Sequence, residues 1–331
     1  MATSRRIPLG YNNVYLLAYG EVRVLVDAGP DYAGATDLIL SSLGGTPPDL
    51  VVATHGHLDH AGLGAWWQAQ RVPVGMGEAD QHLAGTTQLA SQREFDRFGA
   101  YVRQLGAPDE VVTEIIDGLA RRREWAREAA KDQPHPPGGE GRWPTQLRYR
   151  HFQPDLALGD GAIIGGTSLE VVLCPGHTPG NLVLFDASEG WLFSGDQLLP
   201  DITPTPAIQA SPAATLAGEW RFPSLPRFLD SMLRIRRLNP IECWPGHGEP
   251  FKGVVSMIDE NIGQIEQRTA RVLEVLKRRG EAPIYDLAAD LYPRALRRRF
   301  WQIVATVQGH LDLLEERGLA TTASGLYAPV S

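Results

Sequence analysis

Short apolar segments separated by turn residues make up the first 55 residues of the chain. Residues 14–18 and 22–26 are rich in Val, Leu and Tyr, and the Tyr-Gly-Glu turn between them predicts a β-hairpin. Residues 35–43 place apolar side chains at helical spacing and stop at two glycines, which predicts a helix. Residues 49–54 predict a buried strand that runs directly into His55. The order strand, helix, strand favours a layered α/β domain.

The middle of the chain changes from strand patterns to helical patterns and back. Residues 81–131 repeat apolar positions near the helical period, which predicts an insertion of two or three helices. Residues 132–144 are rich in Pro and Gly and predict a loop. Further strands are expected at residues 169–173, 182–185 and 191–193.

The last part of the chain is helical again. Residues 260–316 predict helices, and residues 318–330 predict a small hairpin. A length of 331 residues suggests two domains, at ~150 residues per domain. We therefore predict a first domain over residues 1–262, with the insertion at about 81–144, and a second domain over residues 263–331.

Composition and charge exclude several classes of protein. Hydrophobic residues make up 43% of the chain and charged residues 21%, which is too apolar for a disordered protein. The only cysteines, Cys174 and Cys243, exclude a disulfide scaffold and a four-cysteine metal site. A formal net charge of -8 does not favour a general nucleic-acid binder. No segment approaches the ~18 apolar residues of a membrane span, and the first residues lack the pattern of a signal peptide. We therefore expect a cytoplasmic protein with no membrane partner.

Histidine and aspartate side chains gather where predicted strands end. Four of them lie in one loop after the strand at residues 49–54: His55, His57, Asp59 and His60. Three more follow other apolar runs, each beside a glycine: His177, Asp196 and His247. Glycine allows the backbone to turn sharply, so these side chains could reach a shared cleft. Imidazole and carboxylate groups together suit Zn²⁺ and related metals, and the set of seven predicts a metal site.

The order of these motifs resembles that of the metallo-β-lactamase-fold hydrolase superfamily. The motifs are His-x-His-x-Asp-His, Pro-Gly-His, Ser-Gly-Asp and Pro-Gly-His-Gly, and the resemblance covers about residues 7–252. It implies a four-layer αβ/βα sandwich with the site at one edge of two facing sheets. It also implies that His55, His57 and His177 bind one metal ion. A second ion would be bound by Asp59, His60 and His247, with Asp196 bridging both. Asn181 stands where the superfamily often has a histidine, which removes none of the seven.

The resemblance implies a metal-dependent hydrolase. We expect two divalent cations, zinc first, with iron or manganese as alternatives. Two such ions about 3.5–4 Å apart can share a water molecule and bring its pKa toward neutrality, which gives hydroxide. Asp59 would be the catalytic residue that orients this hydroxide or passes a proton to the leaving group. The substrate class we favour is an acyl compound such as a thioester or lactone. Such a site attacks acyl carbonyls, and the predicted helical insertion would form an apolar cap that suits an acyl chain.

Several residues near the motifs are candidates for supporting roles. Asp27, at the end of a strand, resembles an acid that supports a ligand in this superfamily, and turn capping is the alternative. Thr178 and Glu249 are candidates to hydrogen-bond ligating histidines. Three further histidines lie in or around the insertion, with no pattern that ties them to a substrate: His82, His135 and His151.

The insertion and the tail are expected to decide what the site acts on. The aromatic candidates for substrate contact are Phe95, Phe98, Tyr101 and Trp125, although helical spacing favours core packing for them. The tail resembles the winged-helix-like C-terminal domain of the β-lactamase-like protein 2 branch of the superfamily, and residues 294–299 hold four arginines. A structural buttress or a dimer surface is favoured over nucleic-acid contact, because an arginine run is usually a solvated face.

Two other activities fit the same residues. An RNA-cleaving phosphodiesterase would use the two ions for an in-line displacement, and the arginines favour it while the net charge does not. A persulfide dioxygenase-like oxidoreductase would use one iron at His55, His177 and Asp196. The partner we expect is a small acyl substrate. Nucleic acid is an alternative that we do not favour, and the sequence leaves open whether the protein forms a homo-oligomer.

Overall fold

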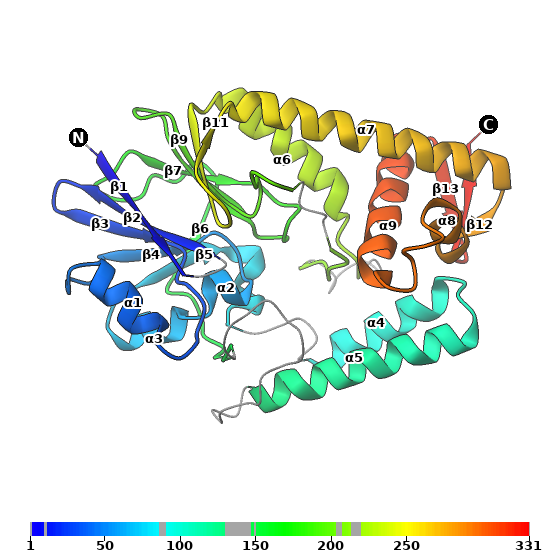
Figure 1. Ribbon diagram of the computed structural model, residues 1–331, viewed down its shortest axis with the longest axis horizontal. Helices are drawn as coiled ribbons and strands as arrows, with labels where there is room; N and C mark the ends of the chain where they lie inside the picture. Colours follow the sequence, from blue (N-terminus) through cyan, green and yellow to red (C-terminus); the bar gives the residue numbers. More distant parts are fainter. Residues whose placement is uncertain are drawn as a thin grey trace.

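Two β-sheets face each other and carry helices on their outer faces (Figure 1). The computed structural model describes residues 2–9, 12–85, 91–129, 147–148, 150–202, 207–212 and 220–330. The first sheet has the strand order β1-β2-β3-β4-β5-β6. Its strands are β1 (Ala2–Pro8), β2 (Asn13–Tyr19), β3 (Val22–Val26), β4 (Leu50–Ala53), β5 (Val74–Gly77) and β6 (Leu156–Leu158). The second sheet has the order β11-β10-β9-β8-β7. Its strands are β7 (Leu169–Leu173), β8 (Leu182–Asp186), β9 (Trp191–Gly195), β10 (Glu242–Pro245) and β11 (Phe251–Lys252).

Three hydrophobic layers hold the sheets and helices together. Val24, Val52 and Leu184 are among the side chains buried between the sheets. Helices α1 (Ala35–Ser42) and α3 (Gly64–Ala69) cover the outer face of the first sheet. Helices α6 (Ser224–Leu238) and α7 (Val254–Arg279) cover the outer face of the second. Each large apolar side chain buried in this way contributes about 1.5–3 kcal/mol. The predicted four-layer αβ/βα sandwich is confirmed.

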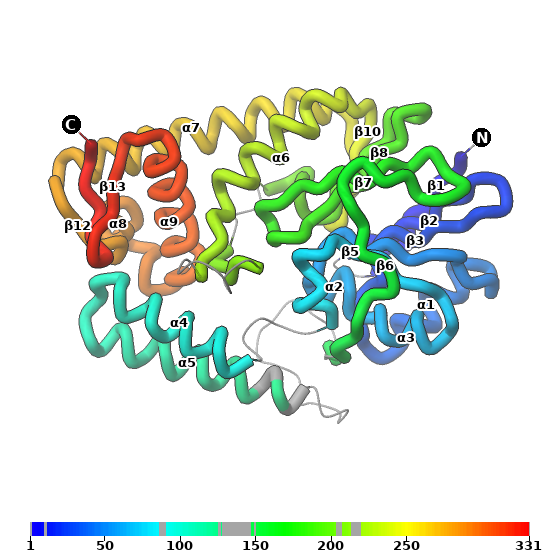
Figure 2. The backbone as a smooth tube through the Cα atoms, turned by 180° about the vertical axis from the view of Figure 1, so that it is seen from behind, coloured from blue at the N-terminus to red at the C-terminus, as the bar shows by residue number. Residues whose placement is uncertain are grey.

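The helical insertion packs against the C-terminal part of the chain (Figure 2). It consists of α4 (Gln92–Gln104) and α5 (Asp109–Ala129). Phe98 and Tyr101 of α4 are buried in a core that also contains Val272 and Val304 from C-terminal helices. Phe98 and Tyr101 are therefore core residues, the role that their helical spacing favours. The prediction for Trp125 lies outside the described side chains.

The C-terminal part continues directly from the sandwich along α7. It contains β12 (Ala282–Pro283), α8 (Ile284–Leu291), α9 (Phe300–Glu316), β13 (Ala320–Ala323) and β14 (Leu326–Pro329). The predicted boundary after residue 262 falls inside α7, which packs on the sandwich through Ile258 and on the C-terminal core through Val272. The hairpin expected at the end of the chain is the pair β13–β14, which forms a small sheet with β12. A winged-helix relationship and the division into domains stay predictions.

Strand β1 and helix α6 are among the elements that the sequence patterns did not predict. Strand β1 pairs with β2 at the edge of the first sheet, and most of its residues are polar and partly exposed. Its sequence lacks the apolar run that marks a strand, so its pairing with β2 decides its structure. Helix α6 starts at Ser224 and contains Pro226 within its first turn, where a missing backbone N–H costs nothing.

The described residues contain no helix that is both long and apolar enough to span a membrane. Helix α7 has 26 residues, but acidic and basic side chains recur along it. A cytoplasmic location stays a prediction.

Replacing His310 should weaken the acid sensitivity of the fold. His310 is 2% exposed on α9, and its Nδ1 lies 2.8 Å from Thr269 Oγ1. Burial, the largest cause, lowers its pKa to about 3. The folded protein therefore keeps this imidazole neutral while the unfolded chain protonates it below about pH 6.5. Stability from this group is present above pH 6.5 and is lost as the pH falls, by about 2 kcal/mol between pH 7 and pH 5.

The comparison uses His310→Leu and urea unfolding at both pH values. Between pH 7 and pH 5, the free energy of unfolding of the parent protein should fall by about 2 kcal/mol more than that of the variant. An equal loss in both proteins would contradict the assignment.

Candidate metal centre

The seven predicted donors all follow the ends of strands. His55 comes directly after β4, and the short helix α2 (Leu58–Ala61), which His57 caps, carries Asp59 and His60. His177, Asp196 and His247 follow β7, β9 and β10. Strand β10 is parallel to β9, and β8 is antiparallel to both β7 and β9. The carboxyl ends of β7, β9 and β10 therefore meet at one edge of the second sheet.

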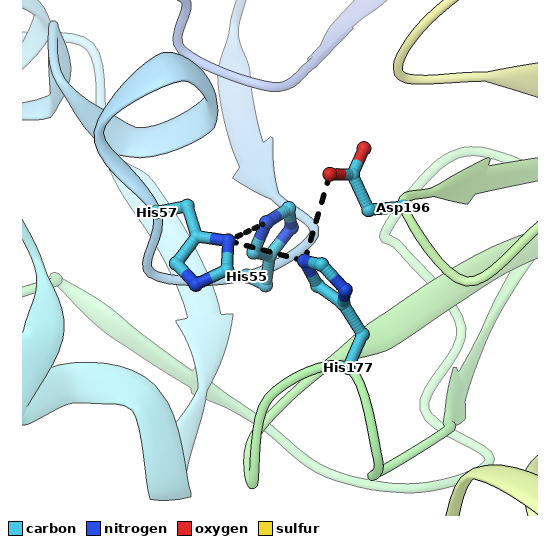
Figure 3. A group of neighbouring side chains, drawn as sticks. All are labelled: His55, His57, His177 and Asp196. Atoms are coloured by element: carbon cyan, nitrogen blue, oxygen red, sulfur yellow. Dashed lines mark hydrogen bonds and ion pairs between the residues drawn. The ribbon is translucent and has the colours of Figure 1, made fainter. Parts of the chain in front are cut away.

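Three imidazole nitrogens and one carboxylate converge in a first group (Figure 3). Nδ1 of His57 lies 2.9 Å from Nε2 of His55 and 3.1 Å from Nε2 of His177. Oδ2 of Asp196 lies 3.5 Å from the same His177 nitrogen.

A second group lies on the other side of Asp196. It consists of Asp59, His60 and His247. Oδ2 of Asp59 lies 3.5 Å from Nε2 of His60 and 3.3 Å from Nε2 of His247. Oδ1 of Asp196 lies 3.3 Å from each of the same two nitrogens. The two oxygens of Asp196 thus face different groups, which is the arrangement that a bridging carboxylate needs.

The chemistry and spacing of these atoms fit divalent cations. Donors about 2.0–2.1 Å from one tetrahedral zinc ion are ~3.3 Å from each other. The distances between the donor atoms of each group are close to that value. Among the described atoms, Oδ1 of Asp196 is buried without a hydrogen-bond partner. A buried carboxylate oxygen in this state is stabilised by a cation, so the residues fit a metal pair.

Asp27 links one ligand of each group. Its Oδ2 lies 2.7 Å from Nδ1 of His60, and its Oδ1 accepts hydrogen bonds from the backbone N–H and the hydroxyl of Thr54. Because the Thr54 hydroxyl donates to Asp27, it accepts from Nδ1 of His55, 3.1 Å away. Both histidines then carry their proton on Nδ1 and leave Nε2 free to bind a metal. Asp27 therefore orients His60 directly and His55 through Thr54, and it does so at a φ of 65°, which is unusual for a residue other than glycine.

A family model for the metallo-beta-lactamase superfamily matches residues 7–223. The chain belongs to this superfamily. A metallo-beta-lactamase family protein from Thermus thermophilus has the same fold, with a TM-score of 0.70 and 22% identity over 99% of this chain and 98% of that one.

Curated relatives of this superfamily member are similar at modest identity. The probable metallo-hydrolase YqjP of Bacillus subtilis is 26% identical over 93% of this chain and 89% of its own length. A beta-lactamase-like protein 2 homolog of Drosophila melanogaster is 24% identical over 92% and 82%. The human acyl-coenzyme A thioesterase MBLAC2 is 30% identical over 56% of this chain and 57% of its own length. These matches confirm the predicted superfamily and the predicted class of enzyme, a metal-dependent hydrolase. They also confirm homology to beta-lactamase-like protein 2.

Asp80 joins the two loops that carry the three histidines of the first group, and the sequence patterns did not reveal it. It lies in the short helix η1 (Glu78–Leu83) and is fully buried. Its carboxylate accepts hydrogen bonds from the backbone N–H of Gly56, the hydroxyl of Thr178 and the backbone N–H of Gly180. Gly56 lies between two ligands and Thr178 is next to a third. Asp80 therefore ties the loop of His55 and His57 to the loop of His177.

The loop of His177 is also packed tightly against α6. Gly176 has a φ of 139°, and a Cβ at this position would lie 2.3 Å from the Cα of Phe228. The hydroxyl of Ser231 donates to the carbonyl of Pro175. A side chain larger than hydrogen at Gly176 would push this loop away from the helix.

The two groups differ in their protonation. Burial, the largest cause, and the neighbouring imidazoles hold the pKa of His55 well below 6.5, and burial lowers that of His177 to about 3. In the second group, burial opposes the charge on His247, but the carboxylates of Asp196 and Asp59, each 3.3 Å from its Nε2, outweigh it and raise its pKa to about 10. A cation bound there replaces the proton on His247 as the counter-charge of the two carboxylates.

The other candidates have different partners. Thr178 donates to Asp80, and Glu249 forms an ion pair with Arg6, so the expected bonds to ligating histidines are replaced by these contacts. The amide of Asn181 donates to the carbonyl of Cys174. Nδ1 of His151 contacts the carbonyl of Ala84. His135 lies outside the described residues.

Replacing Asp80 with asparagine should destabilise the protein by about 2–4 kcal/mol, because an amide group would face buried N–H donors that now meet a carboxylate. The variant should also bind metal less tightly, since the two ligand loops lose their common acceptor. Urea unfolding of the metal-free protein measures the first effect, and equilibrium dialysis measures the second. Asp117→Asn is the matched control, because Asp117 is exposed on α5. Equal behaviour of the two variants would show that Asp80 has no such role.

Proposed function

We propose that this protein hydrolyses acyl thioesters at a pair of bound metal ions. The observation that carries the proposal is the position of Asp196, with one carboxylate oxygen facing each group of donors. Its similarity to acyl-coenzyme A thioesterases supports the substrate class.

In this proposal, His55, His57 and His177 bind one ion, Asp59, His60 and His247 bind the other, and Asp196 binds both. When bound, the ions would lower the pKa of a water molecule and polarise the acyl carbonyl. Nitrogen and oxygen donors of this kind suit zinc first, with iron or manganese as alternatives.

Asp59 is the catalytic residue of the proposal. Its side chain is 19% exposed and ends beside His247, so it can touch both a ligand and a bound substrate. The amide of Asn12 donates to its backbone carbonyl, which fixes its position in α2. Water adds to the carbonyl carbon, the C–S bond breaks, and Asp59 passes the proton from water to the leaving sulfur.

A pocket beside the loop of His177 supports a substrate with an apolar portion. It has a volume of about 720 Å³, within the range of about 300–1,000 Å³ that is usual for small-molecule sites. Its apolar lining includes Leu158, Leu173, Pro175 and Pro179. Pro175 and Pro179 flank His177 along the chain, so we propose that an acyl chain lies in this pocket and reaches the metal centre past the loop of His177.

The test is hydrolysis of acyl-CoA, acyl-glutathione and lactone panels by the metal-loaded protein. We expect thioester turnover that His177→Ala abolishes. Turnover of none of these substrates by protein with bound metal would overturn the proposal. Cleavage of single-stranded RNA in place of thioesters would favour the phosphodiesterase alternative, for which the exposed Arg297, Arg298 and Arg299 are the supporting feature. Helix α9, which follows these arginines, is largely buried against α6, α7 and α8. This burial disfavours insertion of α9 into a nucleic-acid groove.

A further inference from the structure

His177 differs from two of its neighbours in how its position is fixed. The rings of His55 and His60 are held by Thr54 and Asp27. In the part of the chain that the structure describes, the buried Nδ1 of His177 has no hydrogen-bond partner. The backbone of its loop therefore has to place this ring.

The backbone carbonyl of His177 accepts a hydrogen bond from the side-chain amide of Gln209. Gln209 is 3% exposed and belongs to none of the ligand motifs. It lies next to Ala210, which forms an isolated antiparallel bridge with Arg221. In this pairing, the N–H of Phe222 donates to the carbonyl of Gln209, and the N–H of Ser211 donates to the carbonyl of Trp220.

The C-terminal part of the chain fixes the other side of this pairing. Arg221, which is bridged to Ala210 beside Gln209, donates through both terminal nitrogens to the carboxylate of Asp312 on α9. Asp312 is 5% exposed and also accepts from the amide of Gln308. A contact chain thus runs from α9 to the carbonyl of a ligand residue.

The helical insertion also contacts this pairing, through Trp220. The ring of Trp220 makes edge contacts with the rings of Phe98 and Tyr101 on α4, at 5.2 and 5.8 Å between centroids. The hydroxyl of Tyr101 donates to Gln308. Burying an ion pair costs desolvation, so a pair such as Arg221–Asp312 is weak support for stability and is better suited to fixing one arrangement.

We propose that Gln209 is a positioning residue for His177 and that the C-terminal part, through Asp312 and Arg221, holds Gln209 in place. The inference rests on the proposed metal site, and it assigns to the C-terminal part a role in shaping that site. Loss of the Gln209 amide frees the carbonyl of His177, and the His177 ring then leaves the point shared with His55 and His57.

The test is Gln209→Met, which keeps the volume of the side chain and removes its donor. Equilibrium dialysis against zinc gives the dissociation constants of the two metal sites, and His177→Ala and His247→Ala identify which constant belongs to which group. We expect the constant of the His177 group to rise about 10–100-fold and that of the His247 group to change less than ~3-fold. Gln302→Met is the control, because Gln302 is exposed on α9.

Asp312→Asn tests the second part of the proposal. It should raise the same constant in the parent protein and add nothing in the Gln209→Met background, because both changes act through one contact. Unchanged constants in Gln209→Met, or an equal rise at both sites together with a lower metal-free Tm, would overturn the inference. Absence of bound metal in the parent protein would instead overturn the proposed function, and this inference with it.

Discussion

Replacing Asp196 with asparagine should remove at least one of the two metal ions and lower kcat/KM for thioesters on the order of 10³-fold or more. The carboxylate of Asp196 faces His177 with one oxygen, and His60 and His247 with the other. An amide keeps the shape of the side chain but has one oxygen and no charge. It can therefore bind a cation on one side only, and its NH₂ group repels a cation on the other.

The measurement combines metal analysis with thioester kinetics, and Asp117→Asn again serves as the control. The control should keep its metal and its kcat/KM, because Asp117 lies on the exposed side of α5. An Asp196→Asn protein that retains two ions and more than a tenth of the parent activity would contradict the bridging role.

Replacing Asp27 with asparagine should abolish binding at the second group by changing the tautomer of His60. The carboxylate of Asp27 now accepts from Nδ1 of His60 at 2.7 Å and from the backbone N–H and hydroxyl of Thr54. An asparagine that still accepts from Thr54 must point its NH₂ group at His60. Nδ1 of His60 then becomes an acceptor, and its proton moves to Nε2, the nitrogen that faces the metal position. Loss of a supporting partner alone costs about 10–100-fold in metal affinity, and the wrong tautomer should cost more.

Asp27→Ala separates these two effects. Alanine has no group that forces the tautomer, so it should bind metal more tightly than Asp27→Asn. It should also be the less stable variant, because the buried donors of Thr54 and His60 lose their acceptor and φ is 65° at this position. Those changes should cost about 3–5 kcal/mol of the free energy of unfolding, since alanine tolerates this backbone conformation less well than asparagine. Tighter metal binding in Asp27→Asn than in Asp27→Ala would contradict the tautomer argument.

The seven donors that the structure brings together could be named from the sequence because local patterns encode them. His55 follows an apolar strand, and a glycine separates it from His57, so strand ending and ligand spacing are both visible in consecutive residues. The same holds for the glycine-flanked His177, Asp196 and His247. The strands expected at residues 22–26, 169–173 and 191–193 are found as β3, β7 and the first part of β9, because their apolar runs are bounded by turn residues.

Asp27 could be named from the resemblance, but Asp80 and Gln209 could not be predicted, because their roles depend on contacts between distant segments. Asp80 is one aspartate in a short polar stretch, and only the folded chain brings Gly56 and Thr178 to its carboxylate. Gln209 reaches His177 across 32 residues of sequence. The packing of α4 against α9 likewise joins segments about 200 residues apart, and helical periodicity shows an apolar face without showing its partner.

The most direct test of the account is a crystal structure of the purified protein with its metal ions located and identified by anomalous scattering. We expect two ions of zinc or a related divalent metal. One lies among His55, His57 and His177, the other among Asp59, His60 and His247, and each contacts one oxygen of Asp196. A single iron at His55, His177 and Asp196, or an ordered site that binds no metal under saturating zinc, would contradict it.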